Sequence, residues 1–311
     1  MLSRLRQCLE VSGPEKRWEI TAGTAGVASP HRVATEWAGF ILTCGEERRY
    51  AKVLYEDQRP LIDVGRSAAM SRIAGELGIA PRLLAADSEQ GVLIFEALDA
   101  DWRWMKLDQL AAKERFGALR LKLDQLHQAP LPEVSATRYD AIARLHQLCE
   151  RDAVPLPAEM RWFRQCAEIA WQALRLSQPE PAFIHGDNIA SNWMIKGDGA
   201  LCLLDFDYAG AGDPWYDIAT LLNELFPFEQ QWREAIVAWR GRCSDADYAR
   251  CRLYALLDDY YWTLWGFWSG HTSRRSLEFA KVGQWTLLRG RLCLQDPRFE
   301  SWLRIISEGA V

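Results

Sequence analysis

The sequence predicts an α+β protein of two lobes, a small antiparallel sheet followed by a mostly helical part. Short β-like runs separated by small or polar clusters fill residues 18–98, whereas apolar residues recur at helical spacing after Asp99. A chain of 311 residues also suggests about two domains. We place the hinge at residues 95–101, which gives an N-terminal domain of residues 1–98 and a C-terminal domain of residues 99–311.

The individual elements follow from local patterns. β-branched and aromatic runs predict strands over residues 18–21, 40–44, 48–55, 82–87 and 91–98. One helix is expected between Pro60 and Leu77. In the second domain, the apolar spacing from Phe116 to Leu126 predicts a helix that ends before the proline-containing stretch 129–132. Later helices are expected over residues 158–176, 215–225, 229–240, 245–268 and 274–292.

Composition and charge narrow the class of protein. The chain is 49% hydrophobic and 25% charged, which is enough to build a sizeable core. A net charge of -5 argues against nucleic acid as a partner. No apolar run approaches the roughly 18 residues of a membrane helix, and the first residues do not resemble a signal peptide. The eight cysteines form no CxxC pair, so we expect a cytoplasmic protein with reduced thiols. The net charge suits a small-molecule substrate that is polar or cationic.

A polar cluster interrupts the apolar stretch "FIHGDNIASNWMI" (Phe183 to Ile195). Buried polar groups cost free energy unless they are paired, so the stretch is either a capped turn or a site. The dipeptide Asp198-Gly199 that follows favours a two-residue hairpin turn. Residues whose numbers sum to 397 would then face each other, which sets Asn192 opposite Asp205.

Two further acids belong to the same end of this hairpin. Asp187 lies on the loop that leads into it, and Asp207 lies on the face of Asp205 if the second strand continues. Converging carboxylate and amide oxygens suit Mg²⁺, and a remaining Asp can accept the proton of a hydroxyl. An Asp-rich turn beside His185 is the alternative. The agreement of residue types and register favours a phosphoryl-transfer site.

The residues "HGDNIASN" (185–192) resemble the HxDxxxxN catalytic loop of the aminoglycoside phosphotransferase and choline kinase superfamily. The residues "LLDFDYAGAGDPWYDIA" (203–219) resemble its metal-binding segment. This superfamily shares its fold with protein kinases, so the resemblance implies a protein-kinase-like fold with a nucleotide-binding N-lobe and a catalytic, substrate-binding C-lobe.

The resemblance also implies roles for single residues. Asp187 would be the catalytic base, and Asn192 and Asp205 would hold Mg²⁺, with Asp207 as an additional ligand. ATP would be the phosphoryl donor. His185 would brace the catalytic loop rather than act as a base, and Asp213 and Asp217 would have supporting roles.

The nucleotide contacts must come from outside a Walker A motif, because none occurs. Lys52 lies in the alternating run "RRYAKVLYE", and the superfamily carries its phosphate-binding lysine on such a strand; an exposed strand lysine is the alternative. Gly23 and Gly26 stand where the superfamily has a phosphate-covering loop, although a plain turn explains them nearly as well. The resemblance places adenine against the backbone from Phe95 to Leu98.

One departure from the superfamily pattern concerns the helix after Lys52. The superfamily pairs this lysine with a helix glutamate, but residues 63–72 read "DVGRSAAMSR". Asp63 and Glu76 are the nearest acids, and both look misplaced for that role.

The stretch "LLDDYYWTLWGFWSG" (256–270) places Asp258, Tyr261, Trp262 and Trp265 on or next to one stripe of a helix. Aromatic faces with a carboxylate hold amine or quaternary ammonium groups by cation–π attraction. A core stripe is the alternative. The pair Asp258-Asp259 and a likeness of "WTLWG" to bacterial choline kinase-like and LicA-type proteins favour the cationic pocket. Glu224 would add a second carboxylate.

The predicted function is therefore an ATP- and Mg²⁺-dependent kinase that phosphorylates a hydroxyl of a small cationic alcohol, similar to choline or ethanolamine. An aminoglycoside, thiamine or sugar kinase on the same scaffold is one alternative. A nucleotide-binding pseudokinase is the other. The missing helix glutamate favours a pseudokinase, and the complete set of Asp187, Asn192 and Asp205 argues against it.

Overall fold

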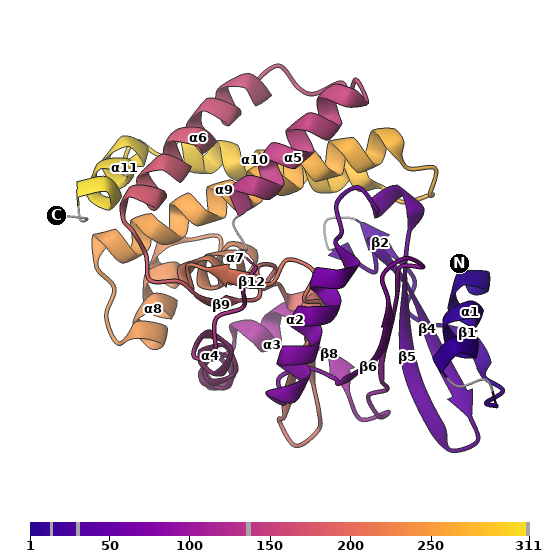
Figure 1. Ribbon diagram of the computed structural model, residues 1–311. Coiled ribbons are helices and arrows are strands. Elements are labelled where there is room, and N and C mark those ends of the chain that lie inside the picture. Colours follow the sequence, from indigo (N-terminus) through magenta and orange to yellow (C-terminus); the bar gives the residue numbers. More distant parts are fainter. Residues whose placement is uncertain (13–14, 29–31, 135–137, 309–311) are drawn as a thin grey trace.

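The computed structural model describes residues 1–12, 15–28, 32–134 and 138–308. Its first lobe is a five-stranded antiparallel sheet, drawn from indigo to purple in Figure 1. The strand order is β1 (Glu19–Ala22), β4 (Trp37–Cys44), β5 (Glu47–Leu54), β7 (Val92–Glu96) and β6 (Leu83–Asp87). These strands agree with the five that the sequence predicts.

The two faces of this sheet bury different helices. On one face, α1 (Leu2–Ser12) packs Leu5 and Leu9 against a cluster that includes Ala51 and Val53 of β5. On the other face, α2 (Val64–Glu76) shares a cluster with Leu54. Because side chains alternate along a strand, Lys52 of β5 points away from α1 and toward the second lobe.

A short hairpin leaves the sheet between β1 and β4. It consists of β2 (Val27–Ala28) and β3 (Arg32–Val33). Near it, Arg275 donates from Nη1 to the backbone oxygen of Thr35 at 2.7 Å and from Nε to Asp57 in η1 (Glu56–Gln58) at 2.9 Å. The residues around the hairpin are therefore tied to the second lobe.

The second lobe is built around one long helix, α9 (Asp245–Thr272), which is orange in Figure 1. This helix is buried along most of its length, because its sequence is apolar or aromatic on nearly every side. The helices that surround it or complete the lobe are α3 (Leu107–Ala111), α4 (Lys113–His127), α5 (Arg138–Arg151), α6 (Met160–Leu176), α7 (Trp215–Leu225), α8 (Glu229–Arg240), α10 (Phe279–Leu294) and α11 (Phe299–Glu308).

Small two- and three-stranded ladders carry the polar segments. β9 (Ala182–Ile184) pairs with β12 (Gly210–Gly212). β10 (Trp193–Ile195) pairs with β11 (Leu201–Leu203) and with β8 (Arg103–Trp104). A 3₁₀ turn, η2 (Ala190–Asn192), leads into β10. Of these strands, β8 lies on the side of the helical lobe that is nearer the sheet (Figure 1).

The predicted hairpin register is wrong by one residue. Trp193 faces Leu203 and Ile195 faces Leu201, so paired numbers sum to 396 rather than 397. The cause is a loop of three residues instead of two. The last pair of the hairpin before this loop is Lys196 and Ala200, in which the Lys196 backbone nitrogen donates to the Ala200 oxygen at 2.9 Å. Asn192 therefore bonds Leu204, and Asp205 lies one residue beyond the ladder.

The predicted helices after residue 158 are confirmed, although α9 extends to Thr272 and α10 begins only at Phe279. The helices α1, α3, α5 and α11 were not predicted. A division of the chain at residue 98 stays a prediction, because the largest apolar cluster joins Met70 and Ala74 of α2 to the helical lobe. Within the described residues, no helix has the length and apolar character needed to cross a membrane.

Candidate functional site

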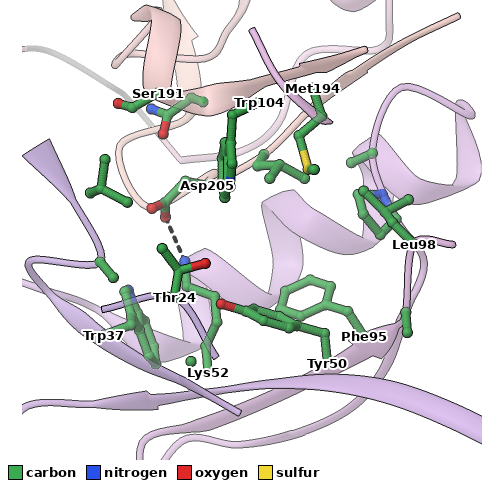
Figure 2. Close-up of a pocket in the computed structure, with 18 of the residues that line it drawn as sticks. Thr24, Trp37, Tyr50, Lys52, Phe95, Leu98, Trp104, Ser191, Met194 and Asp205 are labelled. Atoms are coloured by element: carbon green, nitrogen blue, oxygen red, sulfur yellow. Dashed lines mark hydrogen bonds and ion pairs between the residues drawn. The ribbon is translucent and has the colours of Figure 1, made fainter. Parts of the chain in front are cut away.

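A cavity of about 310 Å³ lies between the sheet and the helical lobe. Its lining brings together most residues that the sequence predicted for nucleotide and metal: Lys52, Phe95, Leu98, Asp187, Asn192 and Asp205. Figure 2 shows Lys52 rising from the sheet toward Asp205 on the opposite wall. Residues that are far apart in the sequence therefore form one cleft.

The loop that carries Asp187 requires a glycine. Gly186 has a φ of +78°, and a Cβ at this position would lie 2.3 Å from the backbone oxygen of Tyr208. Only glycine tolerates both the left-handed backbone and this close approach. The two strands β9 and β12 can thus pass close enough to hold the loop in place.

Asp217, in the first turn of α7, organises this loop. Its carboxylate accepts hydrogen bonds from the backbone nitrogens of His185 at 2.8 Å and Gly186 at 2.9 Å, and it contacts His127 Nε2 at 3.0 Å. The His185 ring contacts the backbone oxygen of Leu204 at 2.8 Å. These contacts agree with the bracing and supporting roles expected for His185 and Asp217.

Asp187 is buried at the centre of the cleft, with 8% of its surface exposed. Asn192 donates from Nδ2 to the backbone oxygen of Asp187 at 2.8 Å and to its Oδ2 at 3.2 Å. Arg32 donates from Nη2 to Oδ1 at 2.8 Å. Burial raises the pKa of the Asp187 carboxyl, although the positive charges of Arg32 and Arg138 oppose the rise.

Asp205 follows directly after the β10–β11 ladder in a strained conformation. Its φ is +69°, which is rare for a residue with a side chain and recurs at functional sites. Lys52 donates from Nζ to Asp205 Oδ1 at 2.6 Å. Burial alone would raise the pKa of Asp205, but the Lys52 ammonium outweighs it, so the pKa is lowered and the carboxylate is charged.

Asp207 does not lie on a continuation of β11, because the strand ends at Leu203. Its Oδ2 accepts a hydrogen bond from Trp37 Nε1 at 2.5 Å. Burial and the negative charge of Asp205 raise the pKa of Asp207 to about 7. Asp207 does not belong to the cavity lining, so its predicted role as a metal ligand has less support than that of Asp205.

The superfamily pattern has a helix glutamate that pairs with the strand lysine, and this chain lacks it. No residue of α2 replaces it. Asp63 instead caps α2 by accepting the backbone N–H of Arg66 at 3.0 Å, and Glu76 is exposed. The position facing the cleft is Ser71, which is too short to pair with Lys52. Asp205 is therefore the carboxylate partner of Lys52.

The oxygen atoms of Asp205 and Asn192 fit Mg²⁺. Asn192 uses its amide nitrogen toward Asp187, which leaves its oxygen as the ligand atom. No three or more His, Cys, Asp or Glu side chains of the described residues are grouped to hold a metal by themselves. Mg²⁺ takes one or two protein carboxylates and fills its other positions with water and phosphate oxygens.

The side of the cleft where the sequence predicts adenine is apolar. Phe95 and Leu98 line it together with Met194 and Trp104 (Figure 2). The two predicted glycines do not line the cavity, whereas Thr24 between them does, so a role of Gly23 and Gly26 in covering the phosphates stays a prediction. Gly23 and Gly26 instead permit close packing, since a Cβ would lie 3.0 Å from the backbone of Gly39 and 3.0 Å from that of Ala34, respectively.

None of the predicted acceptor residues lines the cavity, so their role in binding an acceptor stays a prediction. Asp258 is 3% exposed and already paired: Arg138 Nη2 lies 3.3 Å from its Oδ1, and Trp262 Nε1 donates to the same atom at 3.2 Å. Trp265 is fully buried and donates to Gln58 Oε1 at 3.1 Å. These contacts give Asp258 and Trp265 structural roles.

Glu224 and Tyr261 also have partners inside the protein. Glu224 Oε2 accepts the backbone N–H of Ala190 at 2.5 Å, so it holds the 3₁₀ turn before Asn192. The Tyr261 hydroxyl donates to that of Tyr208 at 3.1 Å. Trp262, whose Nε1 donates to Asp258, also carries a cation on the face of its ring.

Two arginines that the sequence did not single out occupy this aromatic cluster. The guanidinium carbon of Arg32 lies 3.1 Å from the ring centroid of Trp262. That of Arg138 lies 4.3 Å from the Tyr261 centroid and 4.8 Å from the Tyr208 centroid. The cations on these aromatic rings are therefore two arginines of the chain itself, and a substrate cation at this place stays a prediction.

Comparisons with known proteins agree with this arrangement. Residues 38–254 match the model of the phosphotransferase enzyme family. An aminoglycoside 3'-phosphotransferase of Escherichia coli is 28% identical over 182 residues, which cover 55% of this chain and 62% of that protein. Ethanolamine kinase 2 of Mus musculus is 27% identical over 136 residues, or 37% of this chain and 35% of that one. The chain thus matches less than two thirds of either relative's length.

The fold has relatives over its full length. A choline/ethanolamine kinase family protein from Mesorhizobium loti superposes with a TM-score of 0.73 at 19% identity, and the match covers 99% of each chain. This likeness confirms the two-lobed kinase-like fold. The family match, which spans the cleft from β4 to α9, identifies the chain as a member of the phosphotransferase enzyme family.

Proposed function

We propose that this protein transfers the γ-phosphoryl group of ATP, with Mg²⁺, to a hydroxyl of a small cationic alcohol such as choline or ethanolamine. The observation that carries the proposal is the cleft in which Asp187, Asn192, Asp205 and Lys52 meet beside an apolar wall. Each of these residue types has a distinct task in phosphoryl transfer.

The tasks follow from the contacts of each residue. Asp187 would orient the acceptor hydroxyl and accept its proton as the new O–P bond forms and the bond to the leaving ADP oxygen breaks. Lys52 would bind phosphate oxygens from the floor of the cleft. Asp205 and Asn192 would hold Mg²⁺, which supplies charge neutralisation at the phosphates when bound. Phe95 and Leu98 would contact the adenine.

The cationic acceptor is supported by Trp262. The guanidinium of Arg32 lies on its ring and donates to Asp187, so the Trp262 face holds a positive group next to the proposed base. The relation to an ethanolamine kinase supports the same class. An aminoglycoside is the second candidate, supported by the relation to an aminoglycoside phosphotransferase.

The test is Mg²⁺-ATP-dependent release of ADP with choline, ethanolamine, thiamine, aminoglycosides and simple sugars as acceptors. Asp187→Asn serves as the blank. Stimulation by choline or ethanolamine alone is expected. Stimulation by an aminoglycoside or sugar would keep the reaction and replace the acceptor class. ATP binding without stimulation by any acceptor would contradict the enzymatic proposal and favour a pseudokinase.

A further inference from the structure

We propose that Arg32 occupies the acceptor site when no acceptor is bound, that an acceptor must displace it, and that Glu36 receives the displaced guanidinium. This inference rests on the proposed function, since it concerns the same site. It makes Arg32 a specificity-determining residue of the phosphoryl transfer.

Arg32 makes two contacts in the cleft. Its Nη2 donates to Asp187 Oδ1 at 2.8 Å, and its guanidinium carbon lies 3.1 Å from the Trp262 ring centroid. The side chain is only 9% exposed, and Trp262 beneath it is 1% exposed. The guanidinium therefore covers both the proposed base and the aromatic face beside it.

These are the two contacts that the two ends of an amino alcohol would make. Its hydroxyl would donate to Asp187, and its ammonium would lie on the ring of Trp262. Arg32 and such an acceptor cannot hold these positions at the same time. While Arg32 is in place, Asp187 has a guanidinium at one oxygen and the Asn192 amide 3.2 Å from the other.

Glu36 is a carboxylate of the same cavity with one unpaired oxygen. It is 8% exposed; its Oε2 accepts from Thr35 Oγ1 at 2.5 Å, but its Oε1 is buried without a hydrogen bond from any described residue. Arg32 and Glu36 both line the cavity. Burial raises the pKa of Glu36 to about 7, and the charge of Arg32 opposes the rise, so the guanidinium lies within electrostatic reach.

An unpaired buried carboxylate is costly, and a guanidinium is well suited to remove that cost through paired N–H donors. Displacement of Arg32 toward Glu36 would exchange one ion pair for another. The bound acceptor would restore contacts to Asp187 and Trp262. No charge in the cleft would then be left without a partner.

Selectivity follows from this exchange. An acceptor with only a hydroxyl replaces one of the two contacts of Arg32, whereas an amino alcohol replaces both. Water also replaces only one. Arg32 should therefore suppress transfer of the phosphoryl group to water, a side reaction in which a water oxygen forms the bond to phosphorus and ADP leaves.

The first test is ATP hydrolysis without any acceptor, because it needs no knowledge of the acceptor. Arg32→Ala should hydrolyse Mg²⁺-ATP about tenfold faster or more, since a hydrogen-bonded charge pair is removed from the base. Arg72→Ala is the matched control, because Arg72 is an exposed arginine on α2 of the same lobe. A fall in hydrolysis with Arg32→Ala would overturn the proposal and would indicate that Arg32 stabilises the transferred phosphoryl group.

The second test uses choline and ethanolamine as acceptors. Arg32→Ala should lower the acceptor KM with little change in the KM for ATP, and should reduce the preference for choline over a neutral alcohol such as ethylene glycol. Glu36→Gln should raise the acceptor KM while kcat stays within about twofold. In the Arg32→Ala background, Glu36→Gln should have no further effect, because the displaced group is absent. Additive effects of the two substitutions would contradict the exchange.

Failure of the proposed function can be separated from failure of this inference. If no acceptor is phosphorylated, calorimetric binding of tetramethylammonium still reports on the Trp262 face. Arg32→Ala should bind this cation about tenfold more tightly than the unmodified protein. Equal affinity in the two proteins would overturn the inference whatever the reaction is.

Discussion

Asp187 is the residue whose chemistry is most directly testable. Asp187→Asn keeps the size of the side chain and removes its ability to accept a proton. We expect kcat to fall by about 10²–10⁴-fold, the usual contribution of a general base. The affinity for ATP should persist, because Lys52 and the apolar wall are intact. Turnover and calorimetric ATP binding check this; loss of both together would contradict the role as base.

Glu36 gives a prediction about pH and stability. Burial raises its pKa from an ordinary 4.5 to about 7. Between these values the folded protein holds a proton that the unfolded chain has released, so stability falls as pH rises through this window. Glu36→Gln cannot titrate, so the variant should gain up to roughly 3 kcal/mol over the unmodified protein between pH 4.5 and 7.5. Urea unfolding at several pH values measures the difference, and parallel profiles would contradict the prediction.

The sequence identified some single residues of the site and could not identify others. Asp187, Asn192, Asp205 and Lys52 stand in recognisable patterns, and the structure brings them to one cleft. Arg32 lies in no recognisable motif. It could not be identified from the sequence, because its partner Asp187 is 155 positions away. Asp258 had the right type for a cation site, but its cation is the buried Arg138.

Among the elements, the pairing of β9 with β12, which holds the loop of Asp187, depends on Gly186. Gly186→Ala would place a Cβ 2.3 Å from the Tyr208 oxygen in a left-handed backbone. We expect a loss of about 2–4 kcal/mol in the free energy of unfolding, from strain and overpacking together.

The matched control for this substitution is Gly197→Ala, where a Cβ meets no atom within 4 Å and φ is not left-handed. Chemical unfolding and turnover should be affected only by the change at Gly186. Equal losses in the two variants would show that the close approach to Tyr208 is not the cause.

A substitution in helix α4 should instead increase the stability of the protein. Gly117 is an exposed interior residue of this helix, and a Cβ there would meet no atom within 4 Å. Because alanine is the better helix former, Gly117→Ala should raise the free energy of unfolding by about 0.5–1 kcal/mol. Denaturant unfolding measures it, with turnover unchanged; a loss of stability would contradict the helix assignment.

Local patterns predicted most elements but missed those defined by long-range packing. Proline and glycine positions, together with apolar periodicity, fixed α6 to α8 within about two residues. The hairpin register was wrong because Asp198-Gly199 is also compatible with a three-residue loop, in which Gly199 has a φ of +90°. Helix α1 was missed because its apolar stripe is short and becomes evident only against the sheet.

For the whole molecule, binding of nucleotide in the cleft should raise the free energy of unfolding. Mg²⁺-ATP at 100 times its Kd should stabilise the fold by about 2.7 kcal/mol through linkage. Asp205→Ala should abolish the part of this effect that depends on Mg²⁺, because it removes the metal-binding carboxylate and the partner of Lys52. Thermal unfolding with ATP, with and without Mg²⁺, measures it; an unchanged Mg²⁺ dependence would contradict the assignment.

The pairing of Lys52 with Asp205 has a consequence for control of the enzyme. In protein kinases the corresponding lysine pairs with a helix glutamate, and moving that helix makes or breaks the pair. Here α2 contributes no carboxylate to Lys52, and the partner belongs to the helical lobe. A shift of α2 would leave the lysine pair intact, so a binding protein or phosphorylation event acting on that helix has no charge pair to switch. The rate would instead follow the concentrations of nucleotide, metal and acceptor.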